Sequence, residues 1–312
     1  MKHEVKITAL LLAMFFVTQL IGLIVIDAYS PKTITSTLSN GTQLTEVQNV
    51  TIPYGMEPPK MEPEVGFANI AISLVIAIII FFLLMKIQAT TLIRGWFTFV
   101  SLITISIALN ALLITFFPKI DLGLGLEFIA LGLALPLTFY KIFKMNLIVH
   151  NFTELLIYPG LAVIFVPILN VWAIIVLLLI ISVYDMYAVW KSSFMVGLAK
   201  YQIQNLKIFT GFFIPYLTKD QLAKFKAIKK TSKKKNVKVS LAILGGGDVA
   251  FPLIFAGVIL RASGIIPALV IVTFSTLALM ALFAYSRKGK FYPAMPFLTI
   301  GCLIGWLVTL LL

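Results

Sequence analysis

The sequence predicts an all-α protein that crosses a membrane nine times, with a cytoplasmic N-terminus and an extracytoplasmic C-terminus. Of its 312 residues, 60% are hydrophobic and only 12% are charged, whereas roughly 25% are charged in an average soluble domain. Apolar stretches close to 20 residues long recur along the chain, and about 20 residues span the ~30 Å hydrocarbon layer as a helix. The basic residues are also distributed unevenly between the segments that join these stretches.

The expected spans follow the apolar stretches in order. The first is too long for the core of a signal peptide and lacks a clear cleavage site with small residues, so we expect a retained helix. Only the segment Pro-Ile-Leu-Asn at 167–170 separates the fifth span from the sixth, so one long broken helix over 153–190 is the alternative. The nine stretches lie at 7–28, 65–86, 95–117, 122–140, 153–168, 170–190, 239–260, 263–285 and 291–312.

The lysines and arginines support this topology. With the N-terminus inside, 21 of the 25 basic residues fall in cytoplasmic segments and 4 fall outside. Twelve of the 21 lie in the loop 191–238, yet the short loops alone still favour the inside by 9 to 4. This asymmetry follows the positive-inside rule, so the net charge of +13 mostly reflects topology.

The chain divides into three parts: six helices in 1–190, a basic cytoplasmic loop at 191–238, and three helices in 239–312. The loop contains the lysine-rich segment KAIKKTSKKKNVK. We favour a solvated connection, with contact to anionic lipid as the second interpretation. No aromatic or recognition pattern accompanies the lysines, so we do not expect binding to nucleic acid.

The residues that commonly bind metals or form disulfides are scarce. Cys302 is the single cysteine, which excludes an internal disulfide framework. His3 and His150 are the only histidines, too few for a zinc site. The segment HEVKI begins like a zinc-protease motif but has Ile7 where the second histidine must stand. The sequence therefore predicts no metal and no cofactor.

Two aspartates lie well within apolar spans, and we interpret the other acidic residues as lying in loops or near span ends. At ~1.5 Å of rise per residue, Asp185 lies roughly 9 Å before Lys191 and Asp248 roughly 15 Å after Lys238. Both depths fall toward the cytoplasmic half of the membrane, on successive antiparallel spans. Glu127, near the outer end of its span, is expected to reach the interface or a neighbouring helix.

A carboxylate at such depth is costly, at roughly 2.5 to 3.5 kcal/mol even on the insertion scale. Two carboxyl groups in contact cannot both ionise, so one stays protonated while the other is charged. Such a pair can hydrolyse a peptide, because the carboxylate draws a proton from water while the acid donates to the carbonyl oxygen. The alternatives are two isolated hydrogen-bonding aspartates, or a path for protons or cations.

Three short motifs occur in order. Tyr184-Asp185 is followed some 60 residues later by Gly-Gly-Gly-Asp at 245–248, and Pro-Ala-Met at 293–295 opens the last span. The sequence resembles the presenilin and signal-peptide-peptidase family of GxGD intramembrane aspartyl proteases, and it looks closest to their archaeal presenilin homologues. The third motif of that family is Pro-Ala-Leu, so Met295 is a departure of similar volume. The resemblance covers the whole plan of spans.

The resemblance implies an aspartic endopeptidase without a cofactor that cuts transmembrane segments of other proteins in the lipid bilayer. It also implies the cell membrane of a prokaryote and leaves homo-oligomers open. Gly246 occupies the variable position of the GxGD motif, and we interpret it as a site of close helix packing. The implied catalytic pair is Asp185 and Asp248, and the residues implied to border or shape the substrate site are Tyr184, Gly245, Gly247, Pro293, Ala294 and Met295.

Two other functions compete with this one. A secondary transporter or cation channel could use the same carboxylates, although the chain shows no internal repeat. A prepilin-type GxGD peptidase lacks an element like Pro-Ala-Leu, so the segment at 293–296 favours the presenilin-like branch. A purely structural scaffold leaves both aspartates unexplained.

Overall fold

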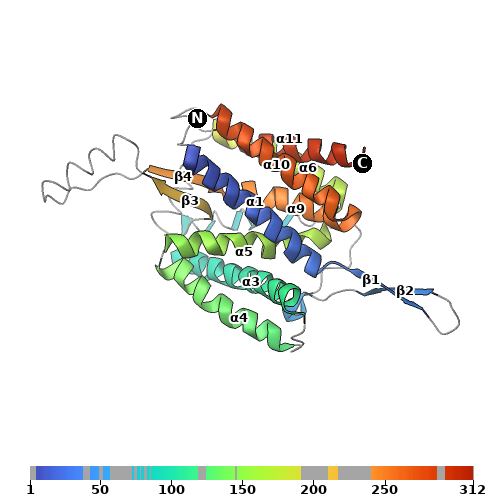
Figure 1. The fold of residues 1–312 in the computed structure, drawn as a ribbon. Coiled ribbons are helices and arrows are strands. Elements are labelled where there is room, and N and C mark those ends of the chain that lie inside the picture. Colours follow the sequence, from blue (N-terminus) through green and yellow to red (C-terminus); the bar gives the residue numbers. More distant parts are fainter. Residues whose placement is uncertain are drawn as a thin grey trace, which may run out of the picture.

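Helices make up most of the chain that the computed structural model describes (Figure 1). The description covers 5–37, 43–48, 52–56, 86–118, 124–144, 146–190, 210–216, 240–286 and 292–311, with scattered residues between 72 and 84. The helices are α1 (Val5–Ala28), α3 (Thr90–Phe116), α4 (Leu124–Phe139), α5 (Leu147–Phe165), α6 (Val171–Trp190), α9 (Gly246–Ser263), α10 (Ile265–Tyr285) and α11 (Met295–Thr309).

Seven helices in the described part of the chain are long and apolar enough to cross a membrane. They are α1, α3, α4 with its π-helical extension Tyr140–Lys144, α5 with the 3-10 turn Val166–Ile168, α6, α9 and α10. α11 is apolar but shorter, with 15 residues. Most of the span predicted at 65–86 lies outside the described residues, so the count of nine helices stays a prediction.

The chain breaks between α5 and α6, so the region 153–190 forms two helices and not one. The 3-10 turn contains Pro167, and Leu169 is extended with φ −104° and ψ 137°. Asn170 then begins the next helix, because its Oδ1 accepts a hydrogen bond of 2.7 Å from the backbone N–H of Ala173. The separation predicted from the segment at 167–170 is confirmed.

Helix α5 begins six residues earlier than the predicted start at 153. Asn146 is its N-cap, and its side chain accepts hydrogen bonds from the N–H groups of Ile148 and Val149. The additional turns bring His150 into the helix and move Glu154 away from its end. Both side chains are buried.

The predicted seventh span, 239–260, is wrong at its start. Strand β4 (Ser240–Gly245) occupies this stretch and pairs antiparallel with β3 (Gly211–Tyr216), so that Gly211 lies opposite Gly245. The helix begins only at Gly246. A short apolar run fits a strand as well as a helix, and here pairing with β3 decides the outcome. Strand β3 comes from the basic loop, the rest of which lies outside the described residues.

The second loop, at 29–64, contains the antiparallel strands β1 (Lys32–Thr37) and β2 (Gln43–Gln48). It returns to the bundle at Tyr54, whose N–H donates to Oε2 of Glu127 over 3.1 Å and whose hydroxyl donates to the Glu127 carbonyl over 3.0 Å. Burial raises the pKa of the Tyr54 phenol. The carboxylate of Glu127 is therefore bound by the loop at Tyr54.

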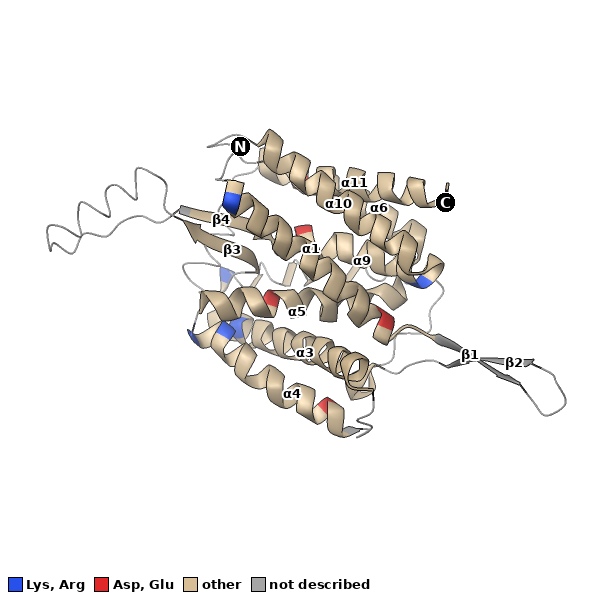
Figure 2. Ribbon diagram, in the orientation of Figure 1, with Lys and Arg blue, Asp and Glu red and all other residues tan. Residues whose placement is uncertain are grey.

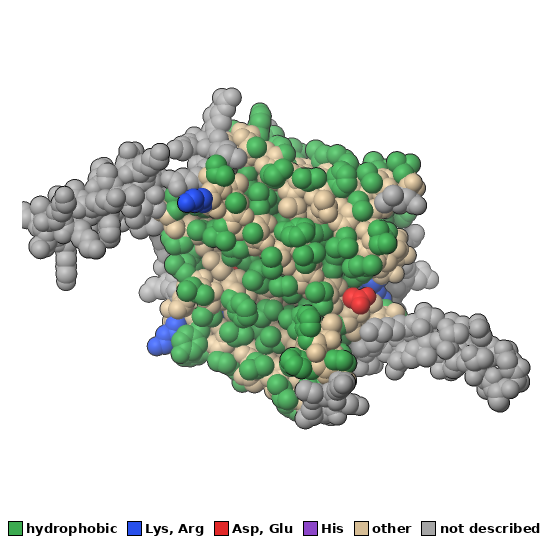
Figure 3. Space-filling model, in the orientation of Figure 1, with side chains coloured by type: hydrophobic (Ala, Val, Ile, Leu, Met, Phe, Trp, Pro, Cys, Tyr) green, Lys and Arg blue, Asp and Glu red, His purple; other side chains and the backbone are tan. Residues whose placement is uncertain are grey.

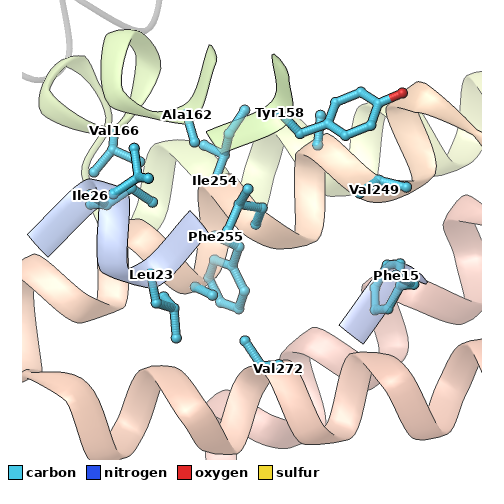
Figure 4. Packing of buried hydrophobic residues seen from close by; sticks show 14 of the residues in the cluster. Phe15, Leu23, Ile26, Tyr158, Ala162, Val166, Val249, Ile254, Phe255 and Val272 are labelled. Carbon is cyan, nitrogen blue, oxygen red and sulfur yellow. The ribbon is translucent and has the colours of Figure 1, made fainter. Parts of the chain in front are cut away.

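Helix α9 lies in the middle of the bundle. Of the seven candidate spans it has the largest buried share, 61%, against 28–50% for the others. It contacts α1, α5, α6, α10 and α11, and Figure 4 shows Phe255 and Ile254 of α9 packed among side chains from α1, α5 and α10. The GGGD motif is thus carried by the most enclosed helix.

The outer surface of the bundle is apolar. In Figure 3 hydrophobic side chains cover most of the visible face between the grey segments. Large side chains such as Ile148, Trp172 and Phe128 are 81%, 69% and 69% exposed. Monomeric soluble proteins rarely expose contiguous apolar patches of more than roughly a few hundred Å². Together with the seven apolar helices, this apolar surface makes the protein an integral membrane protein.

Candidate active site

Asp185 is buried on α6, and its carboxylate lies at the start of α11. Oδ2 accepts a hydrogen bond of 3.0 Å from the backbone N–H of Met295, the first residue of α11. The backbone of Ala294, the N-cap residue, also lies within hydrogen-bonding range of this carboxyl. The first N–H groups of a helix have no partner within the helix and carry a partial positive charge. The start of α11 therefore stabilises the Asp185 carboxylate.

Asp248 lies in the first turn of α9. Gly245 is the N-cap residue of that helix and is extended, with φ −64° and ψ 146°, because it also ends β4. Its backbone N–H lies within hydrogen-bonding range of the Asp248 carboxyl three residues later, as the N–H of the N-cap residue does in half of a capping box. The passage from strand to helix thus places this carboxyl at a helix N-terminus as well.

The three motif glycines have different surroundings. A Cβ on Gly245 would lie 3.0 Å from Oδ2 of Asp248, and a Cβ on Gly246 would lie 2.8 Å from the hydroxyl oxygen of Tyr158. A Cβ on Gly247 would meet only Phe251, at an ordinary 3.6 Å. The first two positions are therefore closely packed, which agrees with the interpretation of Gly246, whereas Gly247 is exposed and has room beside it.

The fold brings the helices of all three motifs together. Helix α6 contacts α9, and α11 contacts both of them. The carboxyls of Asp185 and Asp248 are close enough for a Coulomb interaction between them. The motifs at 184–185, 245–248 and 293–295 therefore surround one site.

A buried hydrogen bond holds α6 and α11 together one turn from Asp185. The hydroxyl oxygens of Ser182 and Thr299 lie 2.7 Å apart, and Ser182 also donates to the carbonyl of Leu178 over 2.8 Å. Hydrogen bonds between membrane helices typically contribute about 0.6 kcal/mol. This contact keeps the start of α11 in register with Asp185.

The other predicted site residues lie around this centre. Tyr184 precedes Asp185, and its side chain is 52% exposed. Pro293 and Met295 are buried, and Ala294 between them is partly buried. No group of three or more His, Cys, Asp or Glu side chains that could hold a metal occurs among the described residues.

A further buried carboxylate, that of Glu154, lies within α5. The interpretation that the acidic residues other than Asp185 and Asp248 lie in loops or near span ends is therefore wrong for Glu154. Glu154 forms an ion pair with Lys141, and the two side chains are 1% and 3% exposed. His150 lies beside them, with Nδ1 3.4 Å from the Lys141 Nζ, and its Nε2 is 2.9 Å from the carbonyl oxygen of Gly211. The signal was the spacing of four residues between His150 and Glu154, which places them on one helix face.

A bundle of apolar helices that gathers a buried and a partly buried aspartate at helix N-termini has the parts of an intramembrane aspartyl protease. A family model described as signal-peptide peptidase, presenilin aspartyl protease, matches residues 45–312. The chain belongs to this family. The protein is therefore an intramembrane aspartyl protease, an endopeptidase of the membrane.

Solved structures show the same fold. A presenilin family intramembrane aspartate protease crystallised in space group C222 has a TM-score of 0.64 and 17% sequence identity, over 98% of this chain and 99% of that one. A structure of such a protease in space group P2 has a TM-score of 0.58 and 18% identity, over 96% of both chains. No curated protein matches the sequence significantly.

Proposed function

We propose that the protein hydrolyses peptide bonds within transmembrane segments of other membrane proteins, with Asp185 and Asp248 as the catalytic pair and water as the nucleophile. The observation that carries this assignment is the hydrogen bond from the Met295 N–H to Asp185, because it joins two motifs that are distant in sequence. The Coulomb interaction between Asp185 and Asp248 adds the third motif.

In the proposed reaction one carboxylate takes a proton from water as the water oxygen attacks the carbonyl carbon. The other carboxyl, still protonated, gives its proton to the carbonyl oxygen. In the second half the C–N bond breaks as the carboxyl that took the proton from water gives it to the leaving nitrogen. The other carboxylate takes back a proton from a hydroxyl of the gem-diol as the new C=O bond forms. The N–H groups at the starts of α9 and α11 hold the carboxyls in place through these exchanges.

The remaining motif residues are proposed to receive the substrate. Gly247 is exposed, and a Cβ there would make only an ordinary contact with Phe251, so an unwound substrate backbone can approach there. Gly245 admits the Asp248 carboxyl, and Tyr184 borders the site. Pro293, Ala294 and Met295 shape it from the side of α11.

The proposed topology has nine helices, the N-terminus inside and the C-terminus outside. Figure 2 supports it, because most of the described lysines and arginines gather at the end of the bundle that carries β3 and β4. The motif at 245–248 follows β4 directly, so the site lies toward this end. The cell membrane of a prokaryote stays a prediction from the resemblance.

The test uses the purified full chain in proteoliposomes with a single-span reporter protein, and the products are identified by mass spectrometry. We expect the wild type to cut within the membrane segment, and the Asp248→Asn variant to lose at least about 100-fold in rate, since such proton transfers contribute 10²–10⁴-fold. The control is Asp27→Asn, an exposed residue at the end of α1. Undiminished cutting by Asp248→Asn would contradict the assignment, and Asp248-dependent ion flux without cleavage would favour a transporter.

A further inference from the structure

Tyr158 stands out among the buried polar side chains of α5. It is 5% exposed, and its hydroxyl lies close to the buried carboxyl of Glu154 one turn earlier on α5. Neither the hydroxyl nor Oε2 of Glu154 has a hydrogen bond of ordinary geometry within the described part of the chain. A buried tyrosine hydroxyl usually finds a partner, and the Glu154 carboxyl is the group within its reach.

Tyr158 lies between the buried Lys141–Glu154 ion pair and the GGGD motif. His150, Glu154 and Tyr158 follow one another at intervals of four residues and so lie on one face of α5. The Tyr158 ring packs edge-on against Phe212 of β3, with 5.9 Å between centroids. The phenol also lies close enough to the carboxyl groups of Glu154 and Asp248 to interact with both electrostatically.

The hydroxyl end of Tyr158 meets the first turn of α9. A Cβ on Gly246 would lie 2.8 Å from the hydroxyl oxygen and 3.2 Å from Cε1 of the ring. Figure 4 shows the Tyr158 ring beside this part of α9, near Val249. The phenol thus fills the space that a side chain at the variable position of the motif would take.

The backbone does not require glycine at 246. The described glycines with positive φ are Gly55, Gly211 and Gly264, so Gly246 has a conformation that alanine can adopt. Alanine is also the better helix former, and it should stabilise a helix where space allows. The contact with Tyr158 is what disfavours it.

We propose that Tyr158 is a positioning residue for the catalytic turn. Its phenol, supported by the Lys141–Glu154 pair and by Phe212, fixes the GGGD turn that carries Asp248, and Gly246 is the matching half of this contact. The inference rests on the proposed role of Asp248. It gives a role in the active site to α5, a helix that carries none of the three motifs.

The test is a suppressor experiment with purified full-length variants and the reporter protein. We expect Gly246→Ala to lower kcat by about tenfold or more with KM within about twofold, because small displacements of a catalytic group are costly. Tyr158→Phe removes the atom closest to the new methyl group. The double variant Gly246→Ala/Tyr158→Phe should therefore recover kcat to near the value of Tyr158→Phe alone.

Thermal unfolding in detergent gives a second readout on the same four proteins. We expect Gly246→Ala to lower the Tm and the double variant to regain most of the loss, a non-additive result typical of residues in contact. Two matched controls are Gly132→Ala, which meets nothing within 4 Å, and Tyr140→Phe, whose side chain is 48% exposed. Both should behave as the wild type.

Different results would refute the role of Tyr158 and the catalytic pair Asp185 and Asp248. A Gly246→Ala chain with the kcat and Tm of the wild type, or a double variant as slow as Gly246→Ala, overturns the role of Tyr158. An Asp248→Asn chain that cuts as fast as the wild type in the same assay overturns the proposed catalytic pair.

Discussion

The backbone N–H of Met295 donates a hydrogen bond of 3.0 Å to Oδ2 of Asp185, across 110 residues of sequence. Asp248 has a corresponding contact with the N–H of Gly245. Each aspartate therefore lies at the positive end of a helix, α11 for Asp185 and α9 for Asp248, where an anion is favoured. This arrangement offsets part of the cost of placing a carboxylate among apolar helices.

Replacement of Gly245 by alanine should slow cleavage. The new Cβ would lie 3.0 Å from Oδ2 of Asp248 and force the carboxyl to move, and a displacement of about 1 Å can cost 10²-fold in rate. The measurement is kcat with the reporter protein, compared with Gly132→Ala, whose Cβ would meet nothing within 4 Å. A kcat for Gly245→Ala equal to that of Gly132→Ala would show that the close approach to Asp248 is not what matters.

Met295 should tolerate leucine better than alanine. The side chain is 3% exposed, so exchange for the family's leucine should change the free energy of unfolding by less than about 1.5 kcal/mol. Alanine should cost about 2–5 kcal/mol through the cavity it leaves, and should also slow cleavage as the start of α11 shifts. Chemical unfolding in detergent measures the first effect, and equal stability of both variants would contradict the packing argument.

The Lys141–Glu154 pair should contribute to stability through compensation of buried charge. Lys141→Met leaves Glu154 buried without its partner and should destabilise the fold by about 3–5 kcal/mol. The double variant Lys141→Met/Glu154→Leu should recover most of this loss, because no unpaired charge remains. Lys144→Met, an exposed lysine in the same π-helical segment, is the control. Equal unfolding curves for Lys141→Met and Lys144→Met would refute the argument.

The cleavage rate should pass through a maximum with pH. Two carboxyls that share one proton are inactive when both are protonated and when both are ionised. The measurement is kcat/KM in proteoliposomes between about pH 4 and pH 9, with Asp27→Asn as the control that keeps the same profile. A rate that rises or falls monotonically over this range would argue against a shared proton.

The two aspartates could be predicted from the sequence because a charge inside an apolar run is conspicuous. The start of α9 could not be predicted from the sequence. The apolar residues at 240–245 have no period long enough to separate strand from helix, and their partner β3 is remote in the chain. The turn that holds Asp248 therefore depends on a tertiary contact.

The buried position of Glu154 could not be predicted for a related reason. The residues before it include His150 and Asn151, which lower the local hydropathy and moved the predicted start of the helix to 153. The structure gives both side chains partners on β3, since His150 bonds to the Gly211 carbonyl and Asn151 exchanges hydrogen bonds with the Phe213 backbone at 3.0 and 3.2 Å. Polar residues with such partners can lie inside a bundle, but a single sequence does not reveal the partners.

The central claim is that Asp185 and Asp248 act as one unit, and the most direct test is the rate of cleavage by Asp185→Ala, Asp248→Ala and the double variant. All three must first insert and unfold like the wild type. We expect the three to fall to the same background, because residues that act together lose their function together. Turnover near the wild-type rate in either single variant, or a double variant slower by the product of the two single losses, would contradict the claim.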